Sequence, residues 1–245
     1  MKAVTVTGPR KRPFALAAGL LVLAGTVIWR YWDENYGGTK TTNDKGKGKP
    51  KRNVWTVLSS PQVLAPGLAS TVFEGSMYLF VFFWAPALKS FQQPSSSSSE
   101  LPYGIIFSRF IAATLASSLA FYTITERRLM QHAALLVAIL VLSAACFFLS
   151  AAPTLEQAAF WVFCLFEAAV GMYWPCMGYL KGRLVDDAVR AQVYGILRIP
   201  LNIFVVVSLL LTGDGNSFGT VFSACSSLLP VSAGALWALM ANHAQ

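Results

Sequence analysis

Charged residues are scarce in this chain of 245 residues, of which Asp, Glu, Lys and Arg make up only 12%. Soluble globular domains carry about 25%, whereas 55% of this chain is hydrophobic. Histidine is limited to His132 and His243, and neither a metal-ligand cluster nor a glycine-rich phosphate loop occurs. We therefore expect neither an enzyme nor a bound metal or cofactor.

Cysteine is also infrequent, and its four occurrences all fall inside apolar segments. They are Cys146, Cys164, Cys176 and Cys225. A free cysteine packs like a small apolar side chain. We therefore expect four thiols packed among helices, with no disulfide framework.

Acidic residues are fewer than basic ones, 11 against 19, which gives the chain a formal net charge of +8. A strongly basic chain can indicate nucleic-acid binding. Here, however, the Lys and Arg residues mostly flank long apolar runs, as they do in the cytoplasmic loops of membrane proteins. We expect the lipid bilayer, and no nucleic acid, as a partner.

Continuous apolar runs recur along the chain and are long enough to cross a bilayer. Hydrocarbon about 30 Å thick requires about 20 helical residues, and the runs do not alternate as barrel strands do. The sequence predicts an all-α polytopic membrane bundle of about seven transmembrane helices. A basic tail at 1–12 precedes a spanning helix at 13–32, a cytoplasmic basic linker at 33–63 and a six-helix bundle at 64–242. The six helices are expected at 64–88, 103–124, 132–150, 155–180, 191–212 and 218–240.

The distribution of basic residues predicts the orientation of these helices. The loops after the first, third and fifth helices hold six, two and three Lys or Arg residues, against one, none and none for the other loops. Cytoplasmic loops are enriched in basic residues, so we expect the first set to be cytoplasmic. The basic residues of the tail at 1–12 then lie outside, against the rule.

Two of the expected helices contain similar sequences. Both read Phe-Glu, then small residues, Met-Tyr, Trp, Pro and finally Lys, starting at Phe73 and at Phe166. Each opens a group of three helices, and the two cross the membrane in opposite senses, as in an inverted repeat. Their carboxylates, Glu74 and Glu167, are expected near the midplane.

Charges inside the membrane are the strongest functional signal, because each costs about 2.5–3.5 kcal/mol at the bilayer centre on insertion scales. Glu74 and Glu167 are expected either to couple transport to protons or to bond helices together. Arg198 could bind a tetrahedral oxyanion, to which its planar guanidinium donates two hydrogen bonds. It could instead pair with Glu167 or Glu74, or extend to the interface.

Further candidates surround these charges. Tyr78, Trp174 and Asn202 complete the expected substrate or coupling set, and Arg109 is a weaker candidate that can extend to the outer interface. Pro200 predicts a local opening of its helix next to Arg198.

The glycines and the aromatic cluster are not interpreted as site residues. Gly171 and Gly178 are expected at close helix contacts rather than around a cavity. Phe80, Phe82, Phe83 and Trp84 are expected to face lipid mostly.

Several segments resemble a known family. They are Trp32–Tyr36, Phe73-Glu74, Phe80–Leu88, Gly104–Ser108, Tyr173–Pro175 and Leu197–Asn202. In order and spacing they resemble helices six to twelve of a major facilitator superfamily carrier, and in local sequence the molybdate-anion transporter family. Arg109 departs from the pattern, which has a small polar residue there.

The resemblance implies the C-terminal half of a secondary carrier for molybdate or a related oxyanion. We expect this carrier in the plasma membrane rather than in internal membranes. The first five helices of the family would be missing, so an N-terminal half is an expected partner. Two alternatives remain open. One is a truncated, non-transporting or partner-dependent membrane protein, and the other is a sugar or drug carrier.

Overall fold

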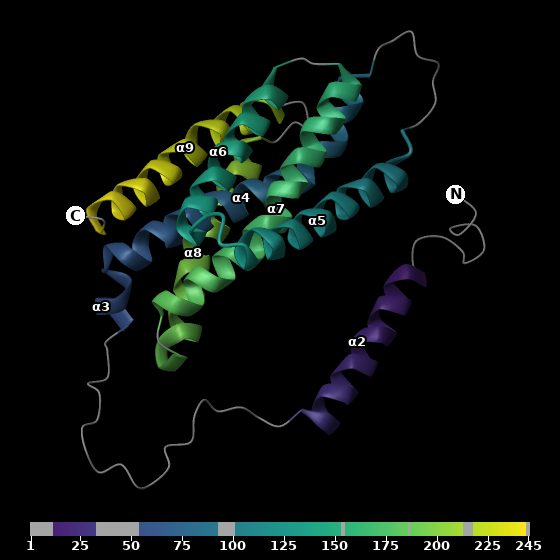
Figure 1. Ribbon diagram of the computed structural model, residues 1–245. Coiled ribbons are helices and arrows are strands. Elements are labelled where there is room, and N and C mark those ends of the chain that lie inside the picture. Colours follow the sequence, from purple (N-terminus) through teal and green to yellow (C-terminus); the bar gives the residue numbers. More distant parts are fainter. Residues whose placement is uncertain are drawn as a thin grey trace, which may run out of the picture. The chain divides into compact units, whose positions relative to one another are not determined.

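The computed structural model describes residues 12–32, 54–92, 101–152, 155–185, 187–212 and 218–243 (Figure 1). The chain divides into two units, Met1–Lys49 and Pro50–Gln245. The described residues form eight helices and no strand. The first unit contributes α2 (Arg12–Tyr31), while the second contributes α3 (Val54–Leu58), α4 (Pro61–Ser90), α5 (Tyr103–Glu126), α6 (His132–Ala151), α7 (Glu156–Leu184), α8 (Asp187–Leu211) and α9 (Phe218–His243). The expected tail at 1–12 lies outside the described residues except for its last residue.

Six of these helices, α4 to α9, are long and apolar enough to cross a membrane. The chain is therefore a multi-pass integral membrane protein with the expected all-α bundle. The apolar part of α2, Ala15–Tyr31, is shorter and stands at the lower limit of length for a span. A seventh span at α2 remains a prediction.

The helix bounds differ from expectation mainly around the basic residues. α7 continues to Leu184 and α8 begins at Asp187, because basic side chains are favourable in the last turn of a helix and need not end it. The expected linker at 33–63 contains the short helix α3, whose buried Val57 and Leu58 join an apolar cluster with residues of α7 and α8. The rest of that linker, up to residue 53, lies outside the described residues.

The long helices form two triplets, α4–α6 and α7–α9, and the helices of each triplet pack mainly against helices of the other. α4 and α7 pack antiparallel, with Ser70 opposite Lys181 and Glu74 opposite Tyr173. α5 packs against α7, and α8 packs against α4, so the second helix of each triplet lies beside the first helix of the other (Figure 1). α6 and α9 pack on each other and on α7 and α4 respectively. This reciprocal pattern is the one that an inverted repeat produces.

Aromatic rings fill the centre of the bundle. The Phe80 ring lies 4.8 Å from Phe166 and 5.1 Å from Phe163, centroid to centroid. Phe80 and Phe83 are buried while Phe82 is exposed. The expectation that this aromatic group faces lipid is therefore wrong for Phe80 and Phe83, because both lie on the face of α4 that packs into the bundle.

The closest helix approach that involves a glycine lies between α5 and α7. A Cβ atom at Gly171 would collide with the carbonyl oxygen of Thr114 and with Ser117 Oγ, whereas a Cβ at Gly178 would meet nothing within 4 Å. Close packing is confirmed at Gly171, and the same expectation is wrong for Gly178.

The predicted orientation can be checked at two exposed helix ends. In a background without native cysteines, Ser90→Cys should react with a membrane-impermeant thiol reagent added outside the cell, and Arg127→Cys only after the cytoplasmic face is opened. The reason is the excess of basic residues in the loops assigned to the cytoplasm. Labelling of both positions from the same side would contradict the alternation of the spans.

Candidate functional site

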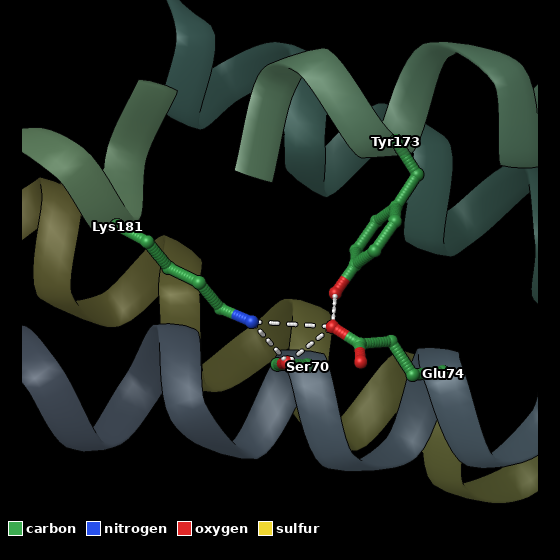
Figure 2. A network of polar contacts seen from close by, with 4 residues as sticks. All are labelled: Ser70, Glu74, Tyr173 and Lys181. Atoms are coloured by element: carbon green, nitrogen blue, oxygen red, sulfur yellow. Dashed lines mark hydrogen bonds and ion pairs between the residues drawn. The ribbon is translucent and has the colours of Figure 1, made fainter. Parts of the chain in front are cut away.

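The most buried carboxylate described in the bundle is that of Glu74, whose side chain is 7% exposed. It lies near the middle of α4, thirteen residues after Pro61 and about 20 Å along the helix at 1.5 Å per residue. Its Oε1 atom accepts three hydrogen bonds: from Ser70 Oγ at 2.6 Å, from Tyr173 OH at 2.9 Å and from Lys181 Nζ at 3.2 Å (Figure 2).

Lys181, from the last turn of α7, forms an ion pair with Glu74. Its Nζ also donates a hydrogen bond to Ser70 Oγ at 2.7 Å and lies 5.7 Å from the centre of the Tyr194 ring on α8. A cation over an aromatic face at this distance is attracted by the ring. The ammonium group is thus held at the junction of α4, α7 and α8.

Tyr173 holds the other side of this network. Its side chain is fully buried, and its ring stacks on Phe73 with centroids 4.0 Å apart and an interplanar angle of 18°. The stacking fixes the ring, so the phenol hydroxyl points at Glu74 (Figure 2). Tyr173 therefore positions the carboxylate and gives it a neutral donor.

A cavity of about 220 Å³ opens beside the network, between α4, α7 and α8. Its lining includes Glu74, Lys181, Trp174 and Arg198. One water molecule occupies about 30 Å³ in the liquid, so the cavity has room for an anion of four oxygen atoms and some water. Two cations and one carboxylate give the lining a net charge of +1.

Arg198 contributes the second cation. Because α8 begins at Asp187, Arg198 lies about 16 Å along the helix, deeper than a start at residue 191 would place it. It forms no ion pair with any described residue, and its side chain is exposed. The alternative in which Arg198 pairs with Glu167 or Glu74 is therefore not found among the described residues, where Lys181 pairs with Glu74.

Glu167 occupies a different place from Glu74. It faces α5, where it accepts a hydrogen bond from Thr114 Oγ1 at 3.0 Å, and it does not line the cavity. The structure thus separates the two carboxylates that the repeated sequence made equivalent.

The other candidates divide between the cavity and its surroundings. Trp174 lines the cavity, while Tyr78 and Asn202 are exposed and do not. Arg109 lies in the N-terminal part of α5, with its guanidinium 5.8 Å from the centre of the Phe160 ring. α8 is helical without interruption through Pro200, so the expected opening of that helix is wrong.

Sequence reasoning missed Lys181, Ser70 and Tyr173. In the sequence Lys181 has the position of a membrane-flanking charge, and neither Ser70 nor Tyr173 carries a charge that would mark it as a site residue. Helical spacing offered one clue, since Ser70 precedes Glu74 by four residues and so lies on the same face of α4.

Comparisons with known proteins bear on this site. A family described as sugar transporters with twelve transmembrane segments matches residues 6–161. Molybdate-anion transporters of Xenopus tropicalis and Takifugu rubripes are each 34% identical to the chain, over 224 and 170 residues. The Xenopus match covers 87% of this chain and 47% of the relative, and the Takifugu match covers 66% and 34%. The chain thus spans less than half of the length of each of these two relatives. No solved structure gives a significant match.

Proposed function

Because this chain belongs to the major facilitator family of twelve-span transporters that it matches, we propose that it is one half of a carrier for a tetrahedral oxyanion such as molybdate. The observation that carries the proposal is the cavity between α4, α7 and α8, where Lys181 and Arg198 lie with a single carboxylate. We also propose that the carrier works in the plasma membrane, where import of an oxyanion begins.

The donors around the cavity suit an oxyanion. Arg198 offers the planar fork that binds two oxygen atoms at once, and Lys181 offers a compact charge with rotatable N–H groups. Hydrogen bonds to charged groups contribute about 1.5–3 kcal/mol each. A sugar carries no charge to balance the +1 of this lining, so the cavity favours the anion named for the relatives over the sugar in the family description.

The exposed faces of α5 and α8 support a partner half. Only 17% of the most apolar stretch of α5 and 11% of that of α8 are buried, against 56% for α4. Arg198 lies on the open face of α8, and a cation at such depth is costly against lipid. A second bundle over this face would enclose the cavity, with the site between the halves as in other carriers. A non-transporting, partner-binding protein would use the same face and is the second candidate function.

Transport measurements test the proposal. Cells that express this chain together with the half of the Xenopus tropicalis relative that it does not match should take up molybdate. Cells with this chain alone should not, because the cavity lacks half of its wall. Uptake by this chain alone would contradict a half carrier.

In the complemented carrier, Arg198→Gln should weaken apparent molybdate affinity by about 10- to 100-fold, the equivalent of about 1.5–3 kcal/mol. Arg198→Lys, which keeps the charge but loses the fork, should weaken it by about tenfold. Arg109→Lys is the matched control outside the cavity and should leave uptake unchanged. Normal affinity in Arg198→Gln would remove the anion site from this cavity.

A further inference from the structure

We infer that the chain binds one phospholipid with a zwitterionic phosphocholine headgroup, whose phosphate pairs with Arg109 and whose quaternary ammonium group pairs with Glu156. The lipid occupies a second cavity, separate from the one that contains Glu74 and Lys181. The inference goes beyond the proposed function, because it does not depend on which solute the carrier moves or on whether the chain transports anything.

The second cavity lies where α4 ends and where α5 and α7 begin. Its volume is about 610 Å³, and its lining includes Leu88 of α4, Ile105 and Ile106 of α5 and Trp161 of α7. All three helices are long and apolar enough to cross a membrane, so the cavity lies at the end of the spans, near the lipid headgroups. Trp161 is exposed, as tryptophans at the membrane interface are. An apolar lining at this level favours a lipid over a water-soluble ligand.

Two opposite charges share this apolar lining. Arg109 supplies the cation and Glu156 the carboxylate, and neither forms an ion pair with a residue that the structure describes. A charge at the edge of the hydrocarbon is costly unless it finds a partner. The charges of the lining sum to zero, so a ligand that carries one charge of each sign can pair with both. An anionic lipid would pair with Arg109 alone and place its charge beside Glu156.

The positions of the two charges match the order of the charges in phosphocholine. The Arg109 guanidinium lies 5.8 Å from the centre of the Phe160 ring. Phe160 follows Glu156 by four residues, about 6 Å along α7. Glu156 is the first residue of α7, so it lies nearer the water than the guanidinium does. In phosphocholine the ammonium group is likewise terminal, a few ångströms beyond the phosphate.

Aromatic rings in the lining favour a choline headgroup. Phe160 and Trp161 both contribute to the cavity together with Glu156. Quaternary ammonium groups bind to aromatic faces, and tryptophan provides the strongest attraction of this kind. A carboxylate with aromatic rings therefore provides what the ammonium end of the lipid requires.

Native mass spectrometry of the purified full chain tests the inference. The chain is equilibrated with mixed detergent micelles that contain equal amounts of dioleoylphosphatidylcholine and dioleoylphosphatidylglycerol. The two lipids share their acyl chains and their phosphate and differ in the net charge of the headgroup. We expect one choline lipid retained per chain, with a preference of about tenfold or more, because only this lipid pairs with both charges. Equal retention of the two lipids, or preference for the anionic one, would overturn the inference whether or not any variant folds.

Variants of the two charged residues assign the ends of the headgroup. Glu156→Gln leaves Arg109 as the single charge of the lining, so the preference should reverse toward phosphatidylglycerol. Arg109→Gln should weaken retention of the choline lipid by about tenfold or more, whereas Arg109→Lys keeps the cation and should retain it. Glu126→Gln, which removes an exposed carboxylate from the opposite end of α5, is the matched control and should behave like the wild type.

Two outcomes would contradict this assignment. A merely structural role of Glu156 would make Glu156→Gln lose both lipids together, without a reversal of preference. A choline lipid that the chain retains alone but releases when the complementing half is joined to it would assign the cavity to the contact between the halves. Neither outcome bears on the anion cavity, so failure of this inference leaves the proposed function in place.

Discussion

Replacing Lys181 by methionine should lower the stability of the bundle by about 3 kcal/mol, because removal of one partner leaves a buried charge uncompensated. For a chain of this size, that loss corresponds to a fall of about 6–12 °C in Tm. The Lys181 side chain is 22% exposed and that of Glu74 only 7%, so the carboxylate would be left mostly buried without its partner. Thermal unfolding of the purified chain in detergent measures the effect.

The pairing is isolated by a double variant. Glu74→Gln combined with Lys181→Met leaves no charge to compensate, and should recover most of the lost stability. Arg183→Met, which removes an exposed cation from the same turn of α7, should change Tm little. A double variant no more stable than Lys181→Met would show that Lys181 stabilises the bundle by packing and not by charge.

Gly171→Ala should cost about 3 kcal/mol, the upper part of the range for overpacked cores. The new methyl group would meet the Thr114 carbonyl oxygen, and a backbone atom of a neighbouring helix cannot rotate away. α5 must therefore move from α7, and the hydrogen bond between Thr114 and Glu167 would break with it. The measurement is again Tm in detergent.

Two other glycines provide graded controls for this effect. A Cβ at Gly75 meets the Phe204 ring, a side chain that can turn, so Gly75→Ala should cost less than Gly171→Ala. Gly178→Ala should be neutral or stabilising, since its Cβ would lie in open space and alanine favours a helix by about 1 kcal/mol. Equal losses at Gly171 and Gly178 would contradict steric packing as the cause.

The fold could be predicted because each membrane span is a continuous apolar run. Such a run can be recognised in the sequence without knowledge of any tertiary contact. Glu74 could be predicted because charge is costly at midspan. Its partner could not, since sequence gives the depth of a residue in its helix more readily than the direction of its side chain. Glu167 and Arg198 have comparable depths, yet they belong to different interfaces.

The direction of the Lys181 side chain could not be predicted from the sequence either. Its place near the end of α7 suggested a charge in water, and only the antiparallel packing of α4 and α7 brings its ammonium group back to Ser70 and Glu74. A long side chain can bury its stem and carry its charge several ångströms from its backbone. The hydropathy pattern does not show how far a side chain carries its charge from the backbone.

Because the helices of each triplet pack mainly against those of the other, the bundle can complete its packing only late in synthesis of the chain. Glu74 and Lys181 are 107 residues apart, which a ribosome needs about 5–20 s to add. During that interval the first triplet stands in the membrane with its carboxylate lacking a counter-ion and with neither α7 nor α8 beside α4. The first triplet cannot reach its final packing until the second arrives, so nascent chains halted after α6 should be the form that membrane quality control recognises and degrades.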